Sequence, residues 1–315
     1  MNQKRINIVQ PSTKEFIKEA RQIPGYRLFD FLHGYVYARW PYLYISLGKE
    51  EHRLSPALAK ISNTINRLLL PLLNPNGSGN NSRQTFAETY HGKVVPLEAA
   101  KQLVSVQEDV RIENLEQIIP YGQARDIVLK NPDHIVALEC PCRAAKAGAC
   151  QPTDVCLIVG EPFASFVKEH HPSRSRWIDS EGAVEILRAE EERGHVHHAF
   201  FKDAMFGRFY AICNCCACCC GAMGANRRGT PMLASSGYVS MVDEDLCIGC
   251  GDCNDYCQFF ALSVNNGYAT IDQSICMGCG VCVTHCPLDA LTLIHDPTKG
   301  EPLEIMKLLS SAANN

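Results

Sequence analysis

Eight cysteines toward the C-terminal end of the chain repeat one spacing twice. They are Cys247, Cys250, Cys253 and Cys257, followed by Cys276, Cys279, Cys282 and Cys286. Each set reads C-x2-C-x2-C-x3-C, so three thiolates lie on a tight loop that can hold three corners of an iron–sulfur cube, and the fourth ligand must come from elsewhere. The pattern predicts two [4Fe-4S] clusters, because two four-cysteine zinc sites would not require this doubled order.

Residues 241–296 closely resemble the bacterial dicluster ferredoxin. Glycines stand between the ligands, where the backbone approaches the inorganic sulfides, and Pro287 follows Cys286 as in the family. Gln258 departs from the family pattern, which usually has proline at that position. The resemblance implies that the fourth cysteine of each set crosses to the other cluster. One cluster is then expected on Cys247, Cys250, Cys253 and Cys286, and the second on Cys276, Cys279, Cys282 and Cys257.

Ten more cysteines lie upstream in two segments, which read C-P-C-R-x6-C-x5-C and C-N-C-C-A-C-C-C. They are Cys140, Cys142, Cys150 and Cys156, then Cys213, Cys215, Cys216, Cys218, Cys219 and Cys220. Ten thiolates suffice for two further four-iron clusters, which would bring the total to about four. Adjacent cysteines point in different directions, so one run can serve two sites. Zinc, copper(I) or unligated thiols are the alternatives for this set, and its allocation stays open.

Positive charges accompany the upstream cysteines. Arg143 and Lys146 lie inside the first segment and Arg208 just before the second, and positive charge close to a cluster stabilises its reduced form. These segments, with 91–100 and 171–180, resemble an uncharacterised family of 4Fe-4S binding proteins of anaerobes that end in a dicluster ferredoxin. The resemblance supports the expected number of clusters.

Composition and charge indicate the cellular compartment of the protein and the kind of partner that it binds. The N-terminus lacks the apolar stretch of a signal peptide and no run reaches the ~18 apolar residues of a membrane span, so the 18 cysteines indicate thiolate ligands in a reducing, anaerobic cytoplasm. The formal charge is −4, yet 241–296 holds eight Asp or Glu and no Lys or Arg, which leaves −4 − (−8) = +4 elsewhere. We therefore expect a redox partner with a basic docking face, and no nucleic acid.

The order of patterns predicts an α+β protein. We expect a helical, aromatic-rich region over 1–110 with a linker near 74–82, a cysteine-rich α/β domain over 111–232, the ferredoxin domain over 233–296 and a tail over 297–315. Helices are predicted at 56–70, 96–103, 114–119, 121–130, 162–170 and 180–193, and strands at 134–138, 155–159, 195–201 and 209–213. If these strands pair, Cys140, Cys142, Cys156 and Cys213 come together.

The aromatic stretch 29–48 is predicted to be a helix broken at Pro41. Its rings would pack against the chain's own cluster domain, or would contact a partner or the inner face of a membrane. Five histidines, at 170, 171, 195, 197 and 198, are interpreted as ordinary polar residues, with a cluster ligand, a haem ligand or a proton-transfer group as the alternatives. No dinucleotide or hydrolase motif occurs.

Three functions fit this pattern. The favoured one is a multi-cluster electron-transfer protein that relays single electrons between a redox partner and an enzyme or membrane carrier. The first alternative is an oxidoreductase with an unusual cluster on the Cys213–Cys220 run, and the second is a redox or metal sensor. The residues suggest an electron carrier or electron-transfer subunit more than a stand-alone enzyme, and no catalytic residue is predicted.

Overall fold

The computed structural model describes residues 9–49, 90–113, 115, 118 and 126–313. The helix predicted at 56–70 and the linker near 74–82 lie outside these residues, as does most of the helix predicted at 114–119. Helices and strands both contribute to the fold, which is α+β as the sequence predicts.

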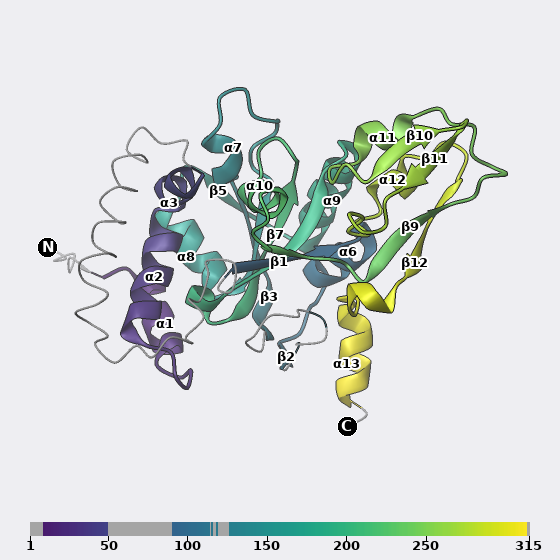
Figure 1. The fold of residues 1–315 in the computed structure, drawn as a ribbon. Coiled ribbons are helices and arrows are strands. Elements are labelled where there is room, and N and C mark those ends of the chain that lie inside the picture. The colour runs from purple at the N-terminus through teal and green to yellow at the C-terminus, as the bar shows by residue number, and fades with distance from the viewer. Residues whose placement is uncertain (1–8, 50–89, 114, 116–117, 119–125, 314–315) are drawn as a thin grey trace, which may run out of the picture.

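An eight-stranded sheet forms the centre of the molecule, with strand order β2-β3-β4-β7-β6-β1-β8 and β5 paired to β3 (Figure 1). Its strands are β1 (Tyr90–Val95), β2 (Val110–Ile112), β3 (Ile127–Leu138), β4 (Cys156–Glu161), β5 (Ser175–Ile178), β6 (Val196–Lys202), β7 (Arg208–Cys215) and β8 (Leu233–Ala234). Neighbours run antiparallel except β1 and β8, which run parallel. The pairing of β3, β4 and β7 brings both upstream cysteine segments to one region of the sheet.

Helices cover both faces of this sheet. Alternate residues of β3 face opposite sides, so Val136 and Leu138 join one hydrophobic core while Ile135 and Ala137 join the other. The first core is covered by α1 (Pro11–Ala20), α2 (Leu28–Arg39), α8 (Phe163–His170) and α10 (Gly221–Arg227), and the second by α6 (Leu97–Val104), α9 (Ser180–Glu192) and α13 (Ile305–Ala313). The cysteine-rich segments lie with the first core.

Local signals position most of these elements. Asp179 caps α9 by accepting a hydrogen bond from the Gly182 N–H at 2.8 Å, and Gly194 follows the helix with φ +78°. The helix predicted at 121–130 is wrong where the structure describes it, because residues 127–130 begin β3. There Ile127 and Leu129 pair with β2 and are buried in the second core, so tertiary packing overrides the helical pattern.

The sheet also crosses two of the expected domain boundaries. Because β1 pairs with β6, and β8 pairs with β1, the sheet includes residues on both sides of 110 and extends past 232. The segment expected as a tail contains the 3-10 helix η2 (Pro297–Lys299) and α13, and its Leu303 and Ile305 are buried in the second core. The C-terminal segment is therefore part of the fold.

The ferredoxin unit is built from two small antiparallel ribbons and two short helices (Figure 1). The ribbons pair β9 (Tyr238–Val242) with β12 (Leu291–His295) and β10 (Leu262–Asn265) with β11 (Tyr268–Ile271), and the helices are α11 (Asp252–Tyr256) and α12 (Val281–Thr284). The unit packs on the sheet through Val281, which shares a small core with Val94 of β1 and Val196 of β6.

The aromatic stretch divides into α2 and α3 (Pro41–Gly48) with a break at Trp40 and Pro41, as predicted. Its inner side chains, including Tyr37 and Ala38, pack against the first core. Its outer side exposes Leu28, Phe29, Leu32, Val36, Trp40 and Leu43. In the part of the chain that the structure describes, no helix combines the length and apolarity needed to span a bilayer.

Candidate metal centres

Two small cavities in the ferredoxin unit are each lined by four cysteines. Cys247, Cys250, Cys253 and Cys286 surround one, and Cys257, Cys276, Cys279 and Cys282 surround the other. Each cavity measures about 20 Å³. In both, three of the lining cysteines come from one loop and the fourth comes from the other set. The ferredoxin resemblance implies the same crossed grouping for the cluster ligands.

The backbone around these cavities fits a cluster. Gly249 and Gly278 adopt φ +65° and +63°, and a Cβ on either would approach a backbone oxygen to within 2.4 or 2.1 Å. Backbone N–H groups donate to the cysteine sulfurs, from Ala261 to Cys257 and from Ala290 to Cys286, both at 3.3 Å. Donors aimed at sulfur favour the thiolate form that iron requires.

The two cavities differ in their access to solvent. One cavity is lined by Cys250 and Ile248, which are both exposed; we call it the outer cavity. Cys276 and Cys282 are buried in what we call the inner cavity, and burial raises the pKa of Cys282 to about 11. Metal binding at the inner cavity must therefore displace the proton that burial holds on the Cys282 thiol.

Eight of the ten upstream cysteines, all except Cys150 and Cys218, line a third and larger cavity of about 80 Å³. Six of these eight form a group that we call the six-thiol set: Cys140, Cys142, Cys156, Cys213, Cys215 and Cys220. Their side chains form a chain of contacts from Cys142 through Cys140, Cys156, Cys213 and Cys215 to Cys220. Hydrogen bonds from Cys156 and Cys215 lower the pKa of Cys213 to about 6, which makes a thiolate available for metal. Aromatic side chains of Tyr37, Phe200 and Tyr210 form part of the wall.

The remaining four upstream cysteines converge at a second point, at the edge of this cavity. Cys150, Cys216, Cys218 and Cys219 are called here the four-thiol set, and their sulfur atoms all lie within 4.8 Å of one another. The short run 213–220 thus supplies both sets. Cys215 and Cys220 line the cavity, Cys218 contacts Cys150, and Cys216 and Cys219 line the cavity and also belong to the four-thiol set. The sequence predicts that adjacent cysteines can serve two sites, and the fold decides which does so.

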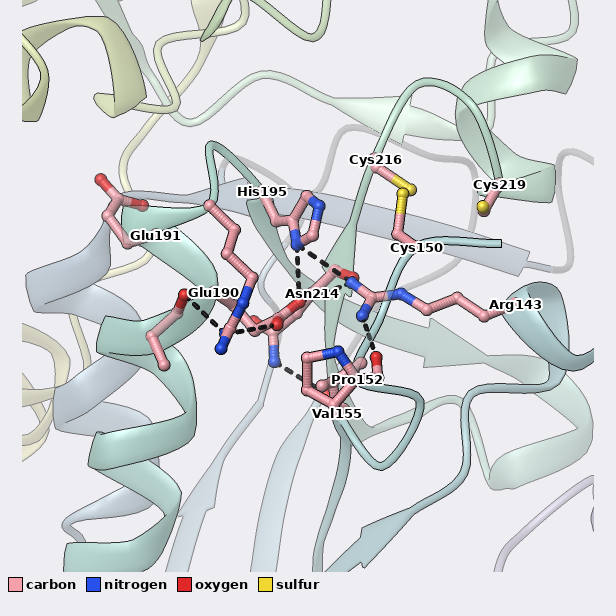
Figure 2. A network of polar contacts seen from close by, with 12 residues as sticks. Arg143, Cys150, Pro152, Val155, Glu190, Glu191, His195, Asn214, Cys216 and Cys219 are labelled. Carbon is pink, nitrogen blue, oxygen red and sulfur yellow. Dashed lines mark hydrogen bonds and ion pairs between the residues drawn. The ribbon is translucent and has the colours of Figure 1, made fainter. Parts of the chain in front are cut away.

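A buried polar network supports the two upstream sets (Figure 2). The Arg143 guanidinium donates to the Glu190 carboxylate at 2.5 Å and to the Asn214 carbonyl at 3.1 Å, and it also donates to the carbonyl of Pro152. Burial opposes the charge on Arg143, but the Glu190 carboxylate outweighs it and raises the pKa of the guanidinium. Burial likewise opposes the charge on Glu190, and hydrogen bonds from His195 and Arg143 hold its pKa below the ordinary value.

The three basic residues singled out in the sequence have different roles. Arg143 lies close enough to Cys140 and Cys216 to interact with both electrostatically, and Lys146 Nζ donates to the Cys218 carbonyl at 2.6 Å. Arg208 instead pairs with Glu19 at 2.7 Å, at the opposite end of β7 from Cys215. The expectation that Arg208 accompanies the second segment is therefore wrong, because a strand separates it from those thiols.

The histidines mostly act as hydrogen-bonding residues within the fold. His195 contacts Glu190 at 2.7 Å, and His197 contacts Asn214 Oδ1 at 2.6 Å and Glu191 at 3.1 Å. His170 lies 2.9 Å from the Thr13 hydroxyl and His171 lies 2.8 Å from the Ala38 carbonyl. His198 is buried in β6, and burial lowers its pKa to about 3, so its ring is neutral.

The inner cavity is tied to the upstream cysteines through Gln258. Its side-chain oxygen accepts a hydrogen bond from the Ala217 N–H at 2.8 Å, and Ala217 lies between Cys216 and Cys218. Gln258 directly follows Cys257, a lining residue of the inner cavity. Arg227 donates to the Ala217 carbonyl at 2.8 Å and lies over the Phe260 ring. Sequence reasoning did not assign this role to Gln258, although its departure from the usual proline was the available signal.

Comparison with known protein families gives a match in the C-terminal part of the chain. The model of the 4Fe-4S dicluster domain matches residues 240–293. This part of the chain is a 4Fe-4S dicluster domain. No curated protein matches the chain. The dicluster domain supports iron–sulfur chemistry at the outer and inner cavities, and the four-thiol set independently presents a grouping able to hold metal.

Proposed function

We propose that this chain is a multi-cluster iron–sulfur electron-transfer protein that relays single electrons between a redox partner and an enzyme or membrane carrier. The dicluster domain would hold one [4Fe-4S] cluster at each of its cavities, and such clusters supply one-electron chemistry without a substrate pocket. The upstream thiols would hold the further metal centres of the relay.

The observation that carries this proposal is the hydrogen bond from Ala217 to Gln258. Cys257 lines the inner cavity, and the next residue, Gln258, contacts the backbone of Ala217. Ala217 lies between Cys216 and Cys218, so this contact joins the inner cavity to the upstream thiols. Thr284 of the dicluster domain also donates to Glu191 at 2.9 Å, beside the Arg143 network. The inner cavity is thus the one joined to the upstream thiols, while Cys250 of the outer cavity is exposed. Electrons from a partner at the outer cavity would pass through the inner one to the upstream centres.

The external partner would dock at the acidic outer surface. Asp243, Glu244, Asp245, Asp252 and Asp255 are all exposed around the outer cavity, and the segment 241–296 has no Lys or Arg to offset them. A partner with a basic docking face fits this charge. The exposed side chains of α2 and α3 would provide a second contact surface, for a partner or for the inner face of a membrane. The many thiolates favour the cytoplasm of an anaerobe as the setting.

The test is the rate at which electrons pass from the dicluster domain to the upstream centre. In Gln258→Pro, the family's usual residue replaces the side chain that accepts the hydrogen bond from the Ala217 N–H. Both clusters of the dicluster domain should still assemble. Electron transfer to the upstream centre should slow by about tenfold or more, because a direct hydrogen-bonded contact is lost. The measurement is freeze-quench EPR after rapid reduction of the anaerobic full-length protein.

The matched control is Pro287→Gln, the same exchange in reverse beside the outer cavity. Pro287 is exposed and follows Cys286, so this change should leave transfer to the upstream centre unaltered. Equal rates in the wild type, Gln258→Pro and Pro287→Gln would contradict a relay through this contact.

A second candidate function, an oxidoreductase, is favoured by the six-thiol cavity. The six-thiol set has two thiols more than a single cubane needs. Tyr37 and Tyr210, whose hydroxyls lie 2.8 Å apart, form part of the cavity wall as potential proton donors. An iron with an open position there would bind carbon monoxide or cyanide. A shift of the upstream EPR signal on adding either to the reduced protein would favour catalysis, and an unchanged signal would favour the relay alone.

A further inference from the structure

The four-thiol set has the dimensions of a site for one metal ion. Cys218 Sγ lies 3.2 Å from Cys150 Sγ, 3.3 Å from Cys216 Sγ and 3.4 Å from Cys219 Sγ, and all four sulfurs lie within 4.8 Å of one another. Four thiolates on one zinc ion, at about 2.3 Å from the metal, stand about 3.8 Å apart at the corners of a tetrahedron. The three short separations lie about 0.5 Å below that value, and the 4.8 Å limit on the remaining pairs leaves room for it.

A cubane would require a wider arrangement. Its four thiolates each bind a different iron, so the body of the cluster holds their sulfurs roughly 6 Å apart. The two dicluster sets provide an internal comparison, since they belong to the 4Fe-4S dicluster domain. Among the described residues, which include all eighteen cysteines, no other group of three or more Cys, His, Asp or Glu ligand atoms is as compact as the four-thiol set. This set therefore differs in geometry from both dicluster sets.

The surroundings of the set match the charge of such a site. A zinc ion with four thiolates has a formal charge of 2 − 4 = −2. Arg143 interacts electrostatically with Cys216, and Lys146 does so with Cys218, so two positive side chains face this charge. The Arg143 side chain is held in place by Glu190, His195 and Asn214 below the thiols, as Figure 2 shows.

We propose that Cys150, Cys216, Cys218 and Cys219 bind a single zinc ion with a structural role. Four thiolates leave no open position, which is typical of structural zinc. The ion would join the loop before β4 to the loop after β7, and would thereby hold Cys215 and Cys220 toward the six-thiol cavity. Iron–sulfur chemistry upstream is then confined to the six-thiol set, and the number of clusters falls below the four that the cysteine count suggests.

The test is a metal count on two single variants of the anaerobic full-length protein. In Cys218→Ser, zinc should fall from about one ion per chain to near zero while iron and acid-labile sulfide stay at the wild-type level. In Cys142→Ser, which alters the six-thiol set, iron should fall and zinc should remain. Loss of about four iron atoms in Cys218→Ser, with no zinc in the wild type, would show a cubane at this site and overturn the proposal.

A measurement on the wild type covers the case in which Cys218→Ser fails to fold. Zinc K-edge X-ray absorption should show four sulfur neighbours at about 2.3 Å and no iron neighbour. Zinc bound by nitrogen or oxygen, or a mononuclear iron signal with no zinc, would equally overturn the assignment. Neither result would bear on electron transfer through the dicluster domain, which the Gln258→Pro experiment tests separately.

Discussion

The dicluster domain and the cysteine-rich layer assemble their thiols in opposite ways. In the dicluster domain, three of four lining cysteines at each cavity come from one short loop, and the helices α11 and α12 follow directly from glycines at φ +92° and +88°. In the cysteine-rich layer, Cys140, Cys156 and Cys213 come from three neighbouring strands or their ends. The thiols of the dicluster domain are thus brought together mainly by a loop, and those of the cysteine-rich layer by the pairing of strands in the sheet.

Because of this difference, we expect loss of metal to affect only the nearby loop in the dicluster domain, but the whole main sheet in the cysteine-rich layer. Loss of a loop-borne cluster would free thiols that a few residues hold together. Loss of an upstream metal centre would leave buried thiols of β4 and β7 without metal, on strands that also carry both hydrophobic cores. We therefore expect metal binding in the cysteine-rich layer to be coupled to the stability of the main sheet.

The largest effect is expected from Cys156→Ser, because Cys156 begins β4 and contacts both Cys140 and Cys213. We expect loss of the upstream iron and a fall in Tm of about 10 °C, as for the loss of several kcal/mol of metal-linked stability. The matched variant is Cys253→Ser, a buried dicluster cysteine, which should lose iron with a much smaller change in Tm of the main sheet. Anaerobic calorimetry and iron counts compare the two, and equal Tm values would contradict the coupling.

A smaller effect, confined to the dicluster domain, is expected from Cys257→Ala. Cys257 lines the inner cavity with Cys276, Cys279 and Cys282, so the cluster bound by those three should be lost or converted to a three-iron form. The outer cluster and the upstream metal should stay. EPR of the reduced and oxidised forms distinguishes the two clusters; loss of the cluster bound by Cys247, Cys250 and Cys253 would refute the crossed arrangement.

The smallest effect is expected at the surface, where Asp243, Glu244, Asp252 and Asp255 are changed together to their amides. None of these side chains lines a cavity, so every metal centre should assemble. Electron exchange with a basic partner should slow by several-fold at low salt, and its dependence on ionic strength should flatten, because screening already acts over about 8 Å at physiological salt. Stopped-flow rates against ionic strength provide the measurement. Identical rates and slopes in both forms would move the docking site to α2 and α3.

The sequence by itself determined the dicluster domain. The spacing of eight cysteines fixes which thiols share a loop, and Gly249 and Gly278 occupy positions where a Cβ would collide with backbone. Helices with strong end signals, such as α9 between Asp179 and Gly194, were also predictable. These features depend on interactions within a few residues, which a single sequence contains.

Only the tertiary structure divided the ten upstream cysteines into six and four. Cys215 and Cys216 are neighbours in the chain, yet they belong to different sets, because the pairing of β7 with β4 and β6 decides which way each side chain points. The contact of Gln258 with Ala217, 41 residues away, depends likewise on how the dicluster domain packs on the sheet. Spacing along the chain cannot specify such contacts, since they form only after distant strands have paired.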